Sequence, residues 1–146
     1  MYTKELKEKI SSFDNDKKME IYEFIQSYVS EMLELDKDDV KEDSLLINEL
    51  GLMSIDFLDL TYSLENKFNI NIPRNGIREN ISEVITEDEF VKDSVITEKG
   101  LELLKFIFDG DAKGRIKEGL REHQIISLFS IKTFVDLTIA QIILSK

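Results

Sequence analysis

The chain of 146 residues contains no cysteine, a single proline and only six glycines. Without cysteine there are no disulfides and no thiolate metal sites, so any reactive thiol must arrive on a prosthetic group. The scarcity of proline and glycine, with 42% hydrophobic and 34% charged residues, indicates a globular, helix-rich protein rather than a disordered one. A chain of this length can form one domain without a disulfide or a metal ion to stabilise it.

Positive charge is also scarce, with 19 Lys and Arg against 30 Asp and Glu and a net charge of −11. Most faces would repel a phosphate backbone or an anionic membrane, so we expect no nucleic-acid ligand and expect basic protein partners. No segment approaches the ~20 apolar residues of a membrane span, and the N-terminus lacks the apolar run of a signal peptide. We expect a cytoplasmic protein, and we expect it to be a monomer.

Metal-binding and catalytic patterns are missing too. The pairs Asp14-x-Asp16 and Asp36-x-Asp38 resemble the start of calcium loops, but neither is followed by the turn glycine or the bidentate glutamate that such loops require. His123 stands alone among polar neighbours, without a nucleophile in a recognisable framework. The sequence therefore predicts no metal site, no catalytic residue and no enzyme.

Apolar residues at helical spacing predict three helices. The first follows a cap at Asp14-Asn15-Asp16. Its apolar stripe comprises Ile21, Phe24, Ile25, Tyr28, Val29, Met32 and Leu33. The second runs from near Ser54 to about Phe68, and the last begins after a Ser130 cap. In the last helix we expect Ile131, Phe134, Val135, Ile139 and Ile142 to be buried.

Between the first two helices, residues 35–48 are polar and acidic, with a few apolar residues that indicate a long loop packed across helix ends. Those apolar residues are Val40, Leu45 and Leu46. On the second helix we expect Leu58, Leu64 and Phe68 to face inward. The acidic residues Asp56, Asp59 and Glu65 should face outward, and Pro73 should end any continuation of this helix.

Residues 74–128 contain further apolar segments. A helix is predicted over 98–108, after a Thr97 cap and before Asp109-Gly110. A weaker pattern predicts a second helix over 115–129, and Val84-Ile85 and Val95-Ile96 are candidates for short strands. The leucine and phenylalanine content of this stretch requires burial, because a structureless loop of this length is uncommon in a compact domain.

One motif, Leu50-Gly51-Leu52-Met53-Ser54-Ile55-Asp56, stands at the start of the second helix. The apolar anchors around it keep a fixed spacing: Val40, Leu45, Leu50 and Gly51 before Ser54, and Ile55, Leu60, Leu64, Phe68, Ile72 and Pro73 after it. In this motif and spacing the chain resembles the acyl carrier protein family. The resemblance covers about half of the chain. It implies an all-α fold, a four-helix bundle like that of acyl carrier proteins, with an extra helical insertion between the second and closing helices.

The resemblance further implies that Ser54 carries 4′-phosphopantetheine, transferred from coenzyme A by a phosphopantetheinyl transferase. The arm would hold an acyl group as a thioester for acyl-loading and acyl-transfer enzymes with basic docking patches. The residues implied to dock these partners are Ile55, Asp56, Asp59, Tyr62 and Glu65. A phosphodiester on Ser54 would lie at the positive end of the second helix, which favours it by ~0.3–1 kcal/mol.

Departures from the family pattern point to a specialised role. Met53 stands where the family commonly has Asp, and Asn66 and Lys67 interrupt the acidic end of the helix. We therefore expect a specialised lipid or related biosynthetic pathway rather than housekeeping fatty acid biosynthesis. The organisation we expect is a single domain, residues 1–146, with a carrier-like core of 17–73 plus 129–146 and an insertion of 74–128. Two alternatives remain open: an aminoacyl or peptidyl carrier, and an unmodified interaction or regulatory protein in which Ser54 is only a helix cap.

Overall fold

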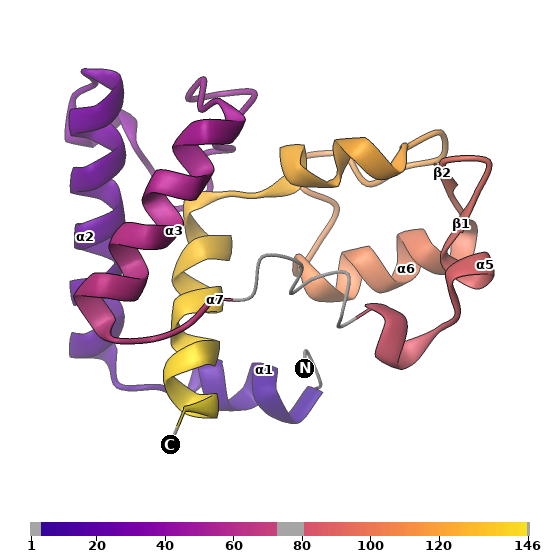
Figure 1. Ribbon diagram of the computed structural model, residues 1–146, viewed down its shortest axis with the longest axis horizontal. Helices are drawn as coiled ribbons and strands as arrows, with labels where there is room; N and C mark the ends of the chain where they lie inside the picture. Colours follow the sequence, from indigo (N-terminus) through magenta and orange to yellow (C-terminus); the bar gives the residue numbers. More distant parts are fainter. Residues whose placement is uncertain (1–3, 73–80, 146) are drawn as a thin grey trace. The chain divides into compact units, whose positions relative to one another are not determined.

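The computed structural model describes residues 4–72 and 81–145 (Figure 1). These residues fall into two compact units. We call residues 4–72 with 130–145 the bundle unit, and residues 81–129 the insert unit. Pro73 and residues 74–80, the start of the expected insertion, lie outside the described residues. That the whole chain is one domain, with the core boundaries given above, stays a prediction.

The bundle unit is built from α-helices and one short 3₁₀ helix. Among the described residues these are α1 (Lys4–Ser11), α2 (Asn15–Leu33), η1 (Lys37–Asp39), α3 (Ser54–Phe68) and α7 (Ile131–Leu144). Figure 1 shows α2 beside α3 and α7, and α2 contacts both. The three predicted helices are confirmed. The sequence did not predict α1, which contacts α7 and buries Leu6 and Ile10.

The core of the bundle unit consists of the apolar stripes of these helices. Its fully buried side chains include Ile21, Ile25, Val29, Leu60, Leu64, Ile131 and Ile139. Two aromatic pairs lie between helices, Phe57 with Phe134 at 5.6 Å between ring centroids and Phe24 with Phe68 at 5.7 Å. Burial of this kind stabilises by about 25 cal/mol for each Å² of apolar surface removed from water, so the helices depend on one another.

The long loop between α2 and α3 is confirmed, and it is anchored rather than free. Val40, Leu45 and Leu46 are buried, as the sequence predicts. The loop also forms a bridge with the start of α7, because Leu45 pairs with Ser130. Backbone hydrogen bonds from Ile131 N–H to the Ser44 carbonyl (3.2 Å) and from Lys132 N–H to the Glu42 carbonyl (2.9 Å) extend this contact.

The insert unit is made of shorter elements. Besides the helical residues 81–84, they are α5 (Glu87–Phe90), β1 (Val91–Lys92), β2 (Val95–Ile96), α6 (Glu98–Ile107) and the 3₁₀ helix η2 (Glu122–Leu128). The strands β1 and β2 form an antiparallel hairpin, and its two turn residues, Asp93 and Ser94, have positive φ angles as in tight hairpin turns. The predicted helix at 98–108 is confirmed, with Thr97 accepting a hydrogen bond from Gly100 N–H at 3.0 Å.

A separate hydrophobic core holds the insert unit together, so the expected burial of its apolar residues is confirmed. Its buried members are Ile81, Ile85, Phe90, Ile96, Leu104, Ile107, Ile116, Leu120 and Leu128. Phe90 is completely buried and lies against Gly100, where an added Cβ would come within 2.5 Å of the Phe90 carbonyl oxygen. Only glycine fits this close approach of helix and backbone.

Two expectations for this region were wrong. The helix expected over 115–129 is replaced by turns and by η2, and Gly119 within this segment takes a positive φ angle that an α-helix cannot contain. Val84 is helical, so Val84-Ile85 is not a strand, whereas the strand at Val95-Ile96 is confirmed. Apart from the short hairpin, the described residues form an all-α fold of the acyl-carrier type, as expected.

Candidate functional site

Ser54 is the first residue of α3, and its side chain is exposed. The N-cap position belongs to Met53, whose side chain makes no capping hydrogen bond. In α7, by contrast, the Ser130 hydroxyl accepts a hydrogen bond from Thr133 N–H at 3.2 Å and so caps the helix. Ser54 therefore does not serve as a helix cap, and within the described residues its hydroxyl has no hydrogen-bond partner.

The loop before Ser54 is anchored in the core by Leu52. Leu52 is buried, and its N–H donates to the Leu46 carbonyl at 2.9 Å. Gly51 turns the chain with a φ of +87°, a conformation that costs other residues free energy. Because the residue two positions before it is anchored in the core, Ser54 has a defined position at the surface.

The N-terminal end of α3 has backbone N–H groups that can bind a negatively charged group. The Asp56 carboxylate accepts a hydrogen bond from Met53 N–H at 2.8 Å, while Asp56 N–H already donates to the Met53 carbonyl. Within the described residues, the N–H groups of Ser54 and Ile55 have no acceptor. Free N–H groups of this kind, with the helix dipole, favour a phosphate by ~0.3–1 kcal/mol at an exposed position. The residues at Ser54 thus fit a covalently attached phosphodiester.

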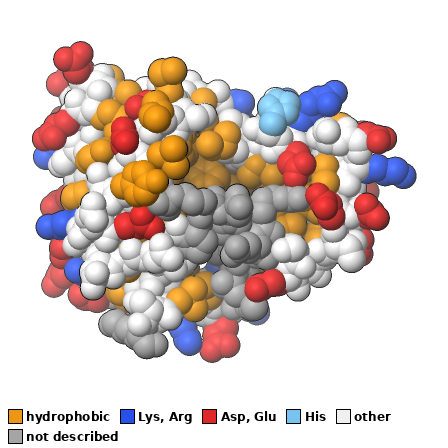
Figure 2. All heavy atoms as spheres, in the orientation of Figure 1, with side chains coloured by type: hydrophobic (Ala, Val, Ile, Leu, Met, Phe, Trp, Pro, Cys, Tyr) orange, Lys and Arg blue, Asp and Glu red, His pale blue; other side chains and the backbone are white. Residues whose placement is uncertain are grey.

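Beyond Ser54, the outer face of α3 is apolar as well as acidic. Ile55 is 61% exposed and Tyr62 52% exposed. Leu58 is also exposed, so the expectation that it faces inward was wrong: the inward positions are Phe57, Leu60, Thr61 and Leu64, one helical face that excludes residue 58. Figure 2 shows hydrophobic side chains over α3, with acidic side chains among them.

Met53 and Leu58 are the residues of this face that the sequence interpretation missed. Met53 is 68% exposed and Leu58 is 42% exposed. A helical wheel would have found Leu58, since it shares the side of Ile55 and Tyr62 at spacings of three and four residues. No comparable signal exists for Met53, which precedes the helix.

The three predicted acidic docking residues differ in their surroundings. Asp59 is exposed and has no hydrogen bond or ion pair with another described residue. Asp56 is half-buried and bound to Met53 N–H, as described above. Glu65 is half-buried and accepts a hydrogen bond from Ile72 N–H at 2.8 Å, which fixes the chain after α3. Two of the three carboxylates therefore also stabilise local structure.

The described residues lack the features of a metal site and of a membrane-spanning helix. The residues described include no group of three or more His, Asp or Glu side chains that could hold a metal ion. None of the described helices has the length and apolar character to cross a membrane. His123 is exposed in η2.

Together, the helical bundle, the anchored loop and the exposed serine at the start of an amphipathic helix define a carrier-type domain. No family model matches the chain, and no solved structure matches it. Several curated proteins, however, match part of the chain. An acyl carrier protein of Guillardia theta is 37% identical over 76 residues, which cover 52% of this chain and 93% of that protein.

Two other relatives agree with this one. The acyl carrier protein AcpXL of Rhizobium meliloti is 32% identical over 48% of this chain and 76% of its own length. An acyl carrier protein of Wolinella succinogenes is 42% identical over 38% of this chain and 72% of its own length. The chain belongs to the acyl carrier protein family. Members of this family are carriers in acyl transfer rather than enzymes, and they bear a covalently attached 4′-phosphopantetheine.

Proposed function

We propose that Ser54 is the attachment point of 4′-phosphopantetheine, and that the arm presents a thioester-bound acyl group to the enzymes of a specialised lipid or related biosynthetic pathway. The observation that supports this most is that Ser54 is exposed at the first position of α3 and takes no part in capping it. Its hydroxyl is therefore available to become the phosphodiester oxygen. When bound, the arm supplies the thiol that this cysteine-free chain lacks.

The carrier itself lowers no chemical barrier. A flexible arm keeps the acyl group at an effective concentration of order millimolar for any enzyme that docks on the protein. The contribution of the chain is to position the arm and to be recognised. A phosphopantetheinyl transferase and acyl-handling enzymes with basic patches are the partners that we propose.

The proposed docking face comprises Ile55, Asp56, Asp59, Tyr62 and Glu65, to which the exposed Met53 and Leu58 are added. Its centre is apolar and its charges are acidic, which suits a partner patch that combines apolar and basic residues. The substitution of Asp by Met53 before the serine makes this face more apolar than the family pattern. That difference supports partners other than the housekeeping enzymes.

The first experiment is intact mass spectrometry after incubation with coenzyme A, Mg²⁺ and a broad-specificity phosphopantetheinyl transferase. The wild type and a matched control, Ser63→Ala on the same helix, should each gain one phosphopantetheine, and Ser54→Ala should gain none. Circular dichroism establishes that the variants remain folded. If neither this transferase nor that of the native host modifies the wild type, the alternative of an unmodified docking protein replaces the proposal.

A second experiment tests the docking face. Asp59 is the suitable position because, unlike Asp56 and Glu65, its carboxylate makes no hydrogen bond or ion pair within the described residues. Asp59→Lys should raise the KM of the transferase several-fold by placing like charge against a basic patch. The matched control is Asp38→Lys in η1, which is also exposed and should change the KM little. Equal effects of the two variants would argue against a local docking face.

A further inference from the structure

A basic loop joins α6 to η2 in the insert unit. The connecting residues 108–121 contain four basic and three acidic side chains. We call residues 112–121 the basic loop, because this stretch has all four cations, Lys113, Arg115, Lys117 and Arg121, and only one of the acids, Glu118. The whole chain has a net charge of −11, whereas the basic loop, with four basic residues and one acidic residue, has a positive net charge. Neither the carrier function nor the docking face of α3 requires it.

The loop has a defined path because apolar residues alternate with the cations. Ile116 and Leu120 are buried in the core of the insert unit. Ile116 N–H donates to the Asp111 carbonyl at 3.0 Å, and the Leu120 carbonyl accepts a hydrogen bond from Ile96 N–H of β2 at 2.8 Å. The neighbouring Arg115 and Lys117 are therefore held at the surface on both sides of a buried anchor.

These cations line a pocket of about 380 Å³ that is formed by residues of the insert unit alone. Gln124 and Ser127 of η2 contribute to the same pocket, and Leu120 is the only lining residue with an apolar side chain. The volume is within the range of small-molecule sites. Because its walls are polar and charged, the pocket does not suit an acyl chain.

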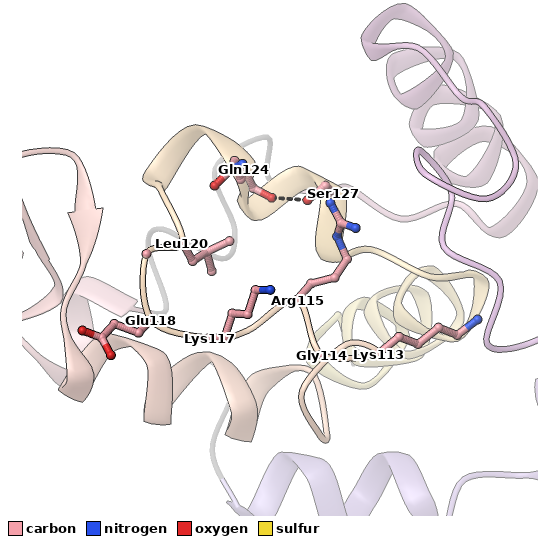
Figure 3. A pocket seen from close by; sticks show the side chains of 9 residues that line it. Lys113, Gly114, Arg115, Lys117, Glu118, Leu120, Gln124 and Ser127 are labelled. Carbon is pink, nitrogen blue, oxygen red and sulfur yellow. Dashed lines mark hydrogen bonds between the residues drawn. The ribbon is translucent and has the colours of Figure 1, made fainter.

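Figure 3 shows how the side chains lie. Arg115 and Lys117 extend toward the side formed by Gln124 and Ser127, whereas Glu118 points away from it. Arg115 is half-buried, whereas Lys117 is exposed. Gln124 Oε1 accepts a hydrogen bond from Arg121 N–H at 2.9 Å, so the amide is held near the loop. The pocket thus combines two cations with a side-chain amide.

We propose that this pocket binds the phosphate group of a small molecule. A guanidinium offers paired N–H donors that match phosphate oxygens, and an ammonium adds a second positive charge for a dianion. The side-chain amide of Gln124 can donate to a remaining oxygen, whereas the Ser127 hydroxyl already donates its hydrogen to the Gln124 backbone carbonyl (Figure 3). The net charge of the chain is −11, so we expect weak non-specific binding of anions to its acidic surfaces. The ligand is either free phosphate or a phosphate ester.

The test is an NMR titration of the ¹⁵N-labelled full chain with inorganic phosphate and, separately, with glycerol 3-phosphate, at constant ionic strength. We expect saturable shifts at amides of residues 113–127. Lys117→Gln should weaken binding about tenfold, the loss of one charge-assisted hydrogen bond, and Arg115→Gln at least as much. Lys105→Gln, which removes an exposed charge of α6 outside the pocket, should leave affinity within about twofold.

Comparing inorganic phosphate with glycerol 3-phosphate shows whether the pocket recognises phosphate alone or a phosphate ester. Equal affinity identifies free phosphate as sufficient, and tighter binding of the ester identifies a phosphorylated metabolite. Ser54→Ala should bind like the wild type, so this result is independent of phosphopantetheine attachment. Because Arg115 is half-buried, the exposed Lys117 provides the variant that keeps the fold intact. Shifts that never saturate, or an equal effect of Lys117→Gln and Lys105→Gln, would overturn the proposal.

Discussion

The bundle unit and the insert unit both bury a hydrophobic core, but they build it from different elements. In the bundle unit, long helices contribute stripes at regular spacing, as in α2 with Ile21, Ile25 and Val29. In the insert unit, a helix of ten residues, a hairpin of two two-residue strands and a 3₁₀ helix each contribute one to a few side chains. A core assembled from short elements depends more on caps and turns, because each element is marginal by itself.

The surfaces of the two units differ as well. The bundle unit presents an apolar and acidic face on α3, where Ser54 lies, whereas the insert unit has a basic loop that lines a pocket. The comparison suggests that the family function and the added feature can be altered separately. Since each unit has its own core, a substitution in one should leave the other largely intact.

The largest effect is expected from Phe90→Ala, because Phe90 is completely buried in the core of the insert unit. Loss of its ring should destabilise that unit by ~3–5 kcal/mol. Native-state hydrogen exchange should show faster exchange at α6 amides and little change at α3 amides. Phosphopantetheine attachment should persist. If attachment is lost in the folded bundle unit, the two units are not independent.

The reciprocal change is Leu60→Ala in α3, where Leu60 is completely buried. We expect a loss of ~2–5 kcal/mol in the bundle unit. Hydrogen exchange should now accelerate in α2, α3 and α7. Phosphate binding at the basic loop, followed by NMR, should remain near the wild-type affinity. Parallel destabilisation of α6 would contradict the separation.

A smaller and more local effect is expected at Gly51. Its φ of +87° strains any residue with a side chain, although nothing lies within 4 Å of an added Cβ. Gly51→Ala should therefore cost ~1–2 kcal/mol through the backbone alone and slow the modification of Ser54. Gly51→Asn is the matched control, since Asn tolerates positive φ and should cost less. Chemical denaturation and the rate of mass gain give the two readouts.

The smallest effect concerns acid stability of the insert unit. The Lys99 ammonium, which donates to the Glu89 carboxylate, and the hydrogen bonds from Thr86 lower the pKa of Glu89 to about 2. A lowered pKa in the folded state gives stability that is present above the ordinary pKa of about 4.5 and is lost as pH falls toward 2. Because Glu89 is exposed, we expect a small difference between wild type and Glu89→Gln that vanishes near pH 2. If the stability difference between the wild type and Glu89→Gln grew as the pH fell, the prediction would be contradicted.

Helical periodicity was sufficient for the long helices, because a regular apolar stripe has one way to become buried. The bounds of α3, Ser54–Phe68, agree with the prediction, as does the Ser130 cap of α7. It failed for Leu58, where apolar character alone suggested burial and the orientation of the helix against its neighbours decided otherwise. It also failed for residues 115–129, where turns and a 3₁₀ helix take the place of the expected helix and Gly119 has a positive φ.

The candidate site divides in the same way. The sequence determined that Ser54 opens an apolar, acidic helix after an anchored loop, because the apolar anchors Leu45, Leu60 and Leu64 keep a fixed spacing, and all three are buried. Only the tertiary structure decided that Met53 rather than Ser54 holds the cap position, and that Asp59 alone of the three acids is without a local hydrogen bond. It also decided that Arg115 and Lys117 share one pocket with Ser127. Periodicity specifies which side of an element is buried, whereas the neighbours of an exposed or half-buried group depend on segments distant in the chain.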